Sequence, residues 1–270
     1  MSPSKREREY ARRRYADWQE RQTKRLERRR RARNISFVVA GVLVPVLVIG
    51  LVWWLAGRGG EGDDVATAPT EPVASEPAAD NPCPEVTTQP DPEPAQFPAA
   101  PDPAVAEGRT WTATVTTTCG DITLELDGAL APQSVANFVQ LAKDGFYDQS
   151  PCHRLTVEGI FVLQCGDPTA TGQGGPGYSW GPIENAPADD LYPAGTLAMA
   201  RVGGDAESQG SQFFLVYEDS TIPSDEAGGY SVFGRITGGL DIVQKIAEGG
   251  VGADGTAPAF AISIEGVTVQ

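Results

Sequence analysis

The residues best suited to chemistry lie in two short runs, Cys152–Leu155 and Gln164–Asp167, with a counterpart at Gly210–Phe214. The first run places a cysteine beside His153, the only histidine in the chain. A cysteine and a histidine in contact would suggest a nucleophilic enzyme. However, the run has the pattern of a strand, in which neighbouring side chains point to opposite faces. We therefore expect His153 to be a packed strand residue with hydrogen bonds and not half of a catalytic pair.

Other motifs for metal or phosphate chemistry are absent from the sequence. One histidine excludes most zinc sites built on imidazole, and the four cysteines lack the Cys-x-x-Cys spacing of a four-cysteine site. The glycine cluster at 172–177 is not followed by Gly-Lys-Ser or Gly-Lys-Thr, and Pro176 lacks a backbone N–H that a phosphate needs. We expect no metal and no other cofactor, and we interpret the cluster as a tightly turning surface loop.

What remains is an apolar, aromatic set of residues with one cation and two amides on runs that read as strands. Its members fall at positions that can converge: Arg154, Gln164, Gln212, Phe161 and Phe214. Such a site has no nucleophile, no metal ligand and no pair of general acid and base. It could bind and polarise a substrate without forming a covalent bond. The simpler interpretation is that Phe161 and Phe214 only fill the core.

The first 56 residues divide into a basic and an apolar segment. Residues 1–34 hold 14 of the 21 lysines and arginines against five acids, which favours a solvated cytoplasmic helix; contact with anionic lipid or RNA is the alternative. Residues 35–56 carry no charge and are long enough, at about 1.5 Å per residue, to cross a bilayer core. We predict an uncleaved signal anchor, a single transmembrane helix of the cell membrane. The basic flank orients its N-terminus to the cytoplasm and the C-terminal domain outside.

The rest of the chain divides into a linker and a globular domain. Residues 57–108 contain 11 of the 22 prolines, many acids and no apolar periodicity, which predicts an extended extracytoplasmic linker. Residues 109–270 are enough for one good core. They carry 20 acids against six bases, and phosphate contacts need clustered cations, so we expect no nucleic acid as a partner of this domain.

The pattern of the globular domain predicts a mainly β fold. Alternating apolar residues predict strands at 111–118 and 121–127, and shorter runs of the same kind follow. Residues 132–143 and 240–249 predict two helices, the first with an apolar face formed by Val135, Phe138, Val139 and Ala142. Many antiparallel strands with two isolated helices indicate a closed β-barrel of about eight strands whose ends the helices cover.

The four cysteines can oxidise if the domain lies outside the cell. Cys152 and Cys165 flank two consecutive strands that should form a hairpin, so we favour a disulfide between them. Cys83 and Cys119 would then be left, and their pairing would tie the linker to the domain. Four cysteines allow three pairings, and the sequence alone does not choose among them.

Several motifs occur in a fixed order between residues 110 and 270. They are Phe146-Tyr147, His153-Arg154, Phe161–Asp167, Thr171–Tyr178, Glu184-Asn185, Gly195–Ala200, Gly210–Phe214 and Tyr230–Ile236. Together they resemble the cyclophilins, a family of peptidyl-prolyl cis–trans isomerases. The combination with a membrane anchor resembles the actinobacterial surface members of that family.

This resemblance implies catalysis of rotation about X–Pro bonds in exported proteins, with a proline-containing peptide segment as the partner. Arg154 would donate a hydrogen bond to the prolyl nitrogen of the twisted amide, which needs no covalent step. Gln164 and the backbone at Ala200–Arg201 would hold the peptide, and Gln212 would orient it or Arg154. The remaining implied contacts form the apolar seat of the proline ring: Phe161, Val162, Phe214 and Ile222.

The sequence departs from the family pattern at a few site positions. Val162 replaces the usual methionine, Arg201 the usual asparagine, and Tyr230 the histidine of many members. The hairpin after Arg154 is two residues longer. No tryptophan stands near Ser220, where cyclosporin-sensitive members carry one, so tight cyclosporin binding is not expected. The alternative functions are a non-catalytic module or chaperone that binds proline peptides, and a structural or adhesion element.

Overall fold

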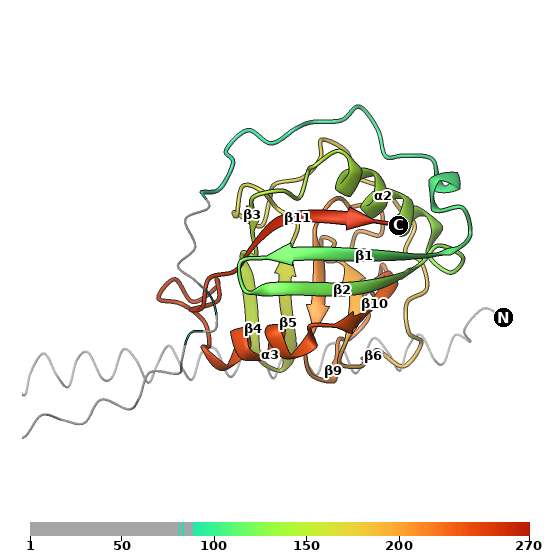
Figure 1. Cartoon of the computed structure of the whole chain (residues 1–270). Coiled ribbons are helices and arrows are strands. Elements are labelled where there is room, and N and C mark those ends of the chain that lie inside the picture. The colour runs from blue at the N-terminus through green and yellow to red at the C-terminus, as the bar shows by residue number, and fades with distance from the viewer. Residues whose placement is uncertain (1–80, 82, 84–88) are drawn as a thin grey trace, which may run out of the picture. The chain divides into compact units, whose positions relative to one another are not determined.

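The computed structural model describes residues 81, 83 and 89–270 (Figure 1). The basic segment, the predicted membrane span at 35–56 and most of the predicted linker lie outside the described residues. Among the described residues, no helix combines the length and the apolar character needed to cross a membrane.

The described residues form eleven strands, two α-helices and one short 3-10 helix, η1 (Pro103–Ala106). The α-helices are α2 (Pro132–Lys143) and α3 (Leu240–Glu248). The strands are β1 (Thr110–Thr117), β2 (Gly120–Asp127), β3 (Ser150–Pro151), β4 (Arg154–Glu158), β5 (Ile160–Cys165), β6 (Leu191–Tyr192), β7 (Thr196–Met199), β8 (Phe213–Val216), β9 (Ser220–Thr221), β10 (Val232–Gly238) and β11 (Ser263–Val269).

Nine of these strands form one curled antiparallel sheet in the order β3-β11-β1-β2-β10-β7-β8-β5-β4, and β6 pairs with β9 (Figure 1). The prediction of a mainly β fold with two helices is confirmed, but the prediction of a closed barrel is wrong, because β3 and β4 do not pair. β3 has only two residues, and Pro151 has no N–H to donate. The free edge of β4 is covered by a loop instead, where the Leu155 N–H donates to the Thr256 carbonyl at 2.8 Å.

Helix α2 packs its predicted apolar face into the main core, and all four predicted residues are buried. Proline at its first position has no N–H to leave unpaired, and Gly145 follows its last turn with φ +71°, a left-handed conformation that suits glycine. Phe138 lies at the centre of this core, with its ring centroid 5.2 to 5.6 Å from those of Tyr147, Phe213 and Phe233. A second, smaller apolar cluster lies on the other side of β5 and β8, around Val162 and Phe214.

The end of the predicted linker follows the surface of the domain as a segment that we call the strap (residues 89–108; teal in Figure 1). Backbone N–H groups of Asp91 and Phe97 donate to carbonyls of the domain, and the carbonyl of fully buried Ala106 accepts from the indole of Trp111. The strap, which belongs to the predicted linker before residue 109, is therefore packed on the domain. Apolar side chains within the proline-rich sequence, Phe97 among them, make this packing favourable.

Both disulfides of the favoured pairing are present. Cys152 is bonded to Cys165, which closes the hairpin of β4 and β5 at its open end. Cys83 is bonded to Cys119, in the turn between β1 and β2. The second bond links the chain before the strap to the domain, so the strap is held covalently at both of its ends.

Candidate functional site

The pairing of β4 with β5 places Arg154 directly opposite Gln164. Both side chains therefore lie on the same face of the hairpin. The Arg154 side chain is exposed, and its Nη1 donates to the Gln164 Oε1 at 3.1 Å. One edge of the guanidinium is thus held in place while the rest remains available to a bound molecule. The expectation that Cys152 and His153 do not form a nucleophilic pair is consistent with the structure, because the Cys152 sulfur is bonded to Cys165.

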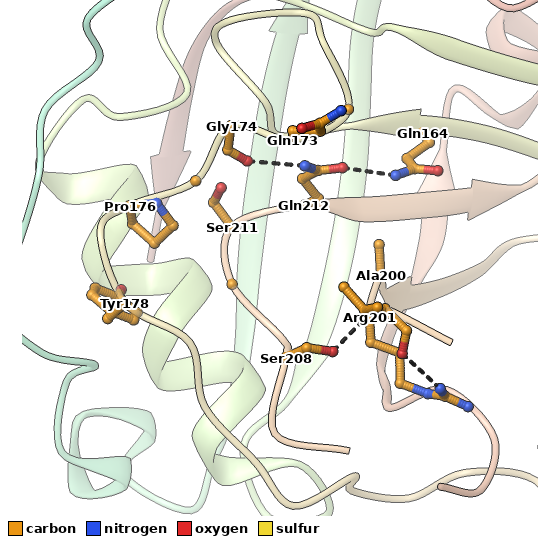
Figure 2. A pocket seen from close by; sticks show the side chains of 14 residues that line it. Gln164, Gln173, Gly174, Pro176, Tyr178, Ala200, Arg201, Ser208, Ser211 and Gln212 are labelled. Carbon is orange, nitrogen blue, oxygen red and sulfur yellow. Dashed lines mark hydrogen bonds between the residues drawn. The ribbon is translucent and has the colours of Figure 1, made fainter. Parts of the chain in front are cut away.

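Gln164 is oriented in turn by Gln212, the residue just before β8. The Gln164 side chain makes the first contact. Its Nε2 donates to the Gln212 Oε1 at 2.8 Å, and the Gln212 Nε2 donates to the Gly174 carbonyl at 2.9 Å (Figure 2). An amide group can rotate by half a turn, but this chain of donors and acceptors permits one orientation of each. The structure therefore brings Arg154, Gln164 and Gln212 together in a single relay that ends on the loop at Gly174.

Beside Arg154 lies a hollow of about 150 Å³ with a polar rim, which we call the apolar hollow after the side chains of its floor. Its floor is the smaller apolar cluster, in which Phe214 and Tyr230 pack edge to face with ring centroids 5.5 Å apart. Eight of the ten predicted catalytic and substrate-binding residues line it, and only Phe161 and Gln212 do not. The lining residues are Arg154, Ile160, Val162, Gln164, Ala200, Arg201, Phe214, Ile222 and Tyr230. An apolar hollow with one cation and a few amides at its rim is suited to a small apolar ring joined to a polar backbone.

Phe161 is the predicted catalytic residue that the structure does not bring to this hollow. Residues alternate along β5, so Ile160, Val162 and Gln164 share one face and Phe161 lies on the other. There its ring packs against Tyr217 at 5.9 Å, next to the main core. Ile160 was not predicted as a site residue, although the same alternation, counted back from Gln164, places it on the face of the hollow.

The side chain of Arg201 is bound within the protein and does not face the hollow as a free cation. It is 1% exposed and forms a bidentate ion pair with Asp225 at 2.9 and 3.0 Å. Its Nε donates to the Gly229 carbonyl, and its guanidinium lies 4.7 Å from the ring centroid of Tyr230. Arg201 therefore fixes the loop of residues 225–230. Because Tyr230 lies at the end of this loop, Arg201 also holds the Tyr230 ring at the hollow.

The backbone at Ala200 has one group free for a peptide. Its N–H donates to the Gln212 carbonyl at 2.9 Å, so the group that remains is its carbonyl, which accepts hydrogen bonds. A peptide lying along this edge would have to offer an N–H to Ala200. The Gln164 amide uses one N–H toward Gln212 and one lone pair toward Arg154, so its second N–H and second lone pair remain for a bound peptide.

A larger hollow of about 370 Å³ adjoins the first, and the two share Gln164, Ala200 and Arg201 (Figure 2). It lies between the glycine cluster at 172–177 and the 208–212 segment. The glycine cluster is a surface loop, as predicted from its sequence. That this loop forms a wall of a second hollow was not predicted, because its contact with the 208–212 segment depends on the tertiary fold.

His153 is buried, as predicted, but it precedes β4 and neither ring nitrogen has a hydrogen-bond partner among the described residues. Burial lowers the pKa of its imidazole; the carboxylate of Asp167 opposes this effect, and the charge of Arg154 adds to it. Burial also tends to raise the pKa of Asp167. Hydrogen bonds from Thr169 and Gly174 outweigh that effect, so the pKa of Asp167 is lowered. His153 is thus a neutral packing residue behind the site.

The comparison with protein families decides the classification. The model of the family "Cyclophilin type peptidyl-prolyl cis-trans isomerase/CLD" matches residues 112–269, which is more than half of the chain. The chain belongs to this family. The resemblance found in the sequence motifs is therefore confirmed.

Two curated mycobacterial relatives of this cyclophilin carry the name "Probable peptidyl-prolyl cis-trans isomerase B". The one from Mycobacterium leprae is 42% identical over 175 residues, which are 60% of this chain and 57% of the relative. The one from Mycobacterium tuberculosis strain H37Rv is 40% identical over 202 residues, 65% of this chain and 63% of the relative. The chain thus spans about three fifths of the length of these relatives.

Among solved structures, a cyclophilin-type isomerase of Cryptosporidium parvum is similar to this chain with a TM-score of 0.51 and 26% identity. The similarity covers 60% of this chain and 98% of that structure. A second crystal structure of the same Cryptosporidium parvum protein, in the presence of the dipeptide Ala-Pro, has a TM-score of 0.50 and 27% identity over 59% of this chain and 98% of that structure.

Replacing Arg201 with methionine should lower the free energy of unfolding by about 3 kcal/mol, because the variant leaves Asp225 without its partner in a largely buried site. The matched control is Arg235→Met, which breaks an exposed ion pair with Glu125 and should cost less than about 1 kcal/mol. Urea unfolding of both variants measures the difference. Equal losses would show that the buried pair contributes no more than the surface pair.

The stability of the domain should fall as the pH is lowered from 7 to 5. The unfolded chain takes up a proton on His153 near its ordinary pKa of about 6.5, whereas the folded chain, with its lowered pKa, does so only at a lower pH. The contribution of neutral His153 to the free energy of unfolding is therefore complete above about pH 6.5, and it is lost as the pH falls toward the lowered pKa of the folded protein. Asp167 and Asp225, with pKa values lowered from 3.8, act only in a more acidic range.

The measurement is the free energy of unfolding in urea at several pH values. His153→Gln should remove the slope between pH 7 and 5, while the slope below pH 4 remains. The single histidine gives one imidazole signal in an NMR titration. A midpoint at or above 6.5 for the folded protein would contradict the assignment.

Proposed function

We propose that the domain catalyses cis–trans isomerisation of X–Pro peptide bonds. The observation that carries this proposal is the exposed Arg154 guanidinium, held by Gln164 at the rim of an apolar hollow of about 150 Å³. The membership of the chain in the cyclophilin-type isomerase family, and the names of its relatives, support it.

The reaction requires only rotation about one bond. The partial double bond of an amide creates a barrier of about 18–20 kcal/mol, and the bond twists out of plane at the top of it. The twisted nitrogen loses resonance with the carbonyl and becomes a hydrogen-bond acceptor. A donor that is better aligned with this state than with either planar state lowers the barrier.

Arg154 is suited to be this donor. A guanidinium remains protonated throughout the usual pH range and presents several N–H groups in one plane. Its Nη1 is committed to Gln164, so the remaining donors face away from that contact. The relay through Gln212 to Gly174 keeps Gln164 from turning, and a fixed donor loses little entropy when the twisted amide forms.

The apolar hollow would hold the proline ring. Val162, Phe214 and Ile222 are each at most 7% exposed and form its floor with Tyr230. A ring fixed there leaves the residue before the proline, and the carbonyl it carries, as the part that rotates. The Ala200 carbonyl would accept an N–H of the flanking peptide. Phe161 has no direct part in this proposal, because its side chain lies on the other face of β5.

We also propose that the domain lies outside the cell and acts on exported proteins. The uncharged segment 35–56 after a basic segment supports an anchor with the N-terminus in the cytoplasm. The two disulfides support an oxidising compartment. Exported proteins fold there, and uncatalysed X–Pro rotation takes tens of seconds or more, which is long enough to delay folding.

Replacing Arg154 with alanine should lower kcat/KM for a proline-containing tetrapeptide by about 100-fold or more, the scale of removing a donor to the transition state. Arg154 is exposed, so the variant should unfold at the same urea concentration as the wild type. Arg154→Lys should also lose most activity, because a single ammonium group does not reproduce the planar fork. A protease-coupled assay of the full chain measures all three proteins.

The matched control is Arg235→Ala, which removes an exposed arginine of β10 paired with Glu125. It should retain wild-type activity. If the wild type itself accelerates isomerisation no more than the Arg154→Ala variant does, the mechanism is wrong. If neither protein accelerates isomerisation, the domain is better described as a non-catalytic module that binds proline peptides.

The location is tested in intact cells that produce the full chain. A protease that does not cross the membrane should remove the domain after residue 108 from spheroplasts and leave the basic segment protected. Alkylation before lysis should leave all four cysteines unmodified, because they are paired. A domain that resists the protease until the cells are lysed, or thiols that react at once, would refute the proposed location.

A further inference from the structure

The glycine cluster at 172–177, here called the glycine loop, forms one wall of the larger hollow that adjoins the apolar hollow (Figure 2). Its inner side is held by two contacts. The Gly174 N–H donates to the Asp167 carboxylate at 3.0 Å, and the Gly174 carbonyl accepts from Gln212 at 2.9 Å. A Cβ at Gly174 would meet the Asp167 carboxylate, so only glycine fits there. The loop is therefore directly joined to the relay that orients Arg154.

The outer side of the glycine loop is held by the strap. The Gln96 Nε2 donates to the Gly175 carbonyl at 3.1 Å, and the Phe97 N–H donates to the Pro176 carbonyl at 2.7 Å. Gly177 has φ +90°, and a Cβ added to it would lie 2.8 Å from the Gln96 side-chain oxygen. The two segments approach each other more closely than a side chain at that position would allow. The contact between the strap and the glycine loop thus requires glycine at position 177.

The strap is itself fixed on either side of this contact. Phe97 is half-buried and packs against Phe146, with ring centroids 6.2 Å apart. The Asp91 N–H donates to the Pro168 carbonyl at 2.9 Å, and further upstream Cys83 is bonded to Cys119. Cys83, Asp91 and Phe97 all precede the part of the chain that matches the family, residues 112–269.

We propose that Gln96 and Phe97 are positioning residues for the substrate site, which consists of the apolar hollow and the larger hollow beside it. They hold the glycine loop from outside, so that it forms the wall of the larger hollow and presents the Gly174 carbonyl to Gln212. Two neighbouring carbonyls of the glycine loop join the strap to the site. The Gly175 carbonyl accepts from Gln96, and the Gly174 carbonyl accepts from Gln212. Gln212 in turn orients Gln164. The strap thus helps to shape the binding site from outside the matched domain. This proposal rests on the proposed isomerase function.

The test compares two double variants of the full chain that loosen the strap at different places. The first, Gln96→Ala with Phe97→Ala, removes one amide contact and one apolar anchor next to the glycine loop. The second, Gln133→Ala with Val105→Ala, removes the amide contact to the Pro101 carbonyl and the half-buried valine of η1, away from that loop. Both should lower the free energy of unfolding, so a loss of stability by itself does not distinguish them.

The expected difference is in substrate binding. The first double variant should raise KM for a proline-containing peptide about three- to ten-fold, the scale of one or two lost hydrogen bonds. It should also shift the side-chain amide signals of Gln212 and Gln164 in NMR spectra. The second double variant should change neither. Exchange spectroscopy at increasing peptide concentration separates KM from kcat for each protein.

Two results would overturn the proposal. One is a wild-type KM in the first double variant. The other is an equal rise of KM in both variants, which would assign the strap a role in stability alone. Failure of the proposed function is distinguishable from both, because the wild-type chain would then show no isomerase activity at all.

Discussion

The antiparallel register of β4 and β5 is the constraint on which the site depends. It sets Arg154 opposite Gln164 and puts both on the face that carries Val162. Because side chains alternate along a strand, a slip of one residue would send the arginine and the apolar floor to opposite faces. The disulfide between Cys152 and Cys165 closes the open end of the same hairpin. Chemistry, packing and covalent structure thus agree on a single register.

A second feature is the division of the apolar residues between two clusters. The main core beneath α2 is large, aromatic and closed, while the smaller cluster around Phe214 keeps one side open as the apolar hollow. An open apolar surface contributes less to stability than a covered one. The buried ion pair of Arg201 with Asp225, and the contact of Arg201 with Tyr230, hold the rim of that hollow in shape. Rigidity at the site therefore comes from polar contacts around it.

Much of the fold could be predicted from local patterns, because alternation and helical periodicity report burial directly. The helix at 132–143, its apolar face and the strand runs were predicted, and so was the hairpin that pairs Cys152 with Cys165. Closure of the barrel was predicted wrongly, because β3 stops at Pro151 and a loop covers the edge of β4. Whether two edge strands meet depends on the curl of the whole sheet, and no local pattern records it.

The sequence by itself determined the family, the hairpin that brings Cys152 close to Cys165, and the presence of one arginine and two glutamines on neighbouring strands. Those properties follow from residue identity and order. The tertiary structure alone decided that the Arg201 side chain is consumed by Asp225 and that the strap contacts the glycine loop. These contacts join residues up to 79 positions apart, so they exist only after the chain has folded.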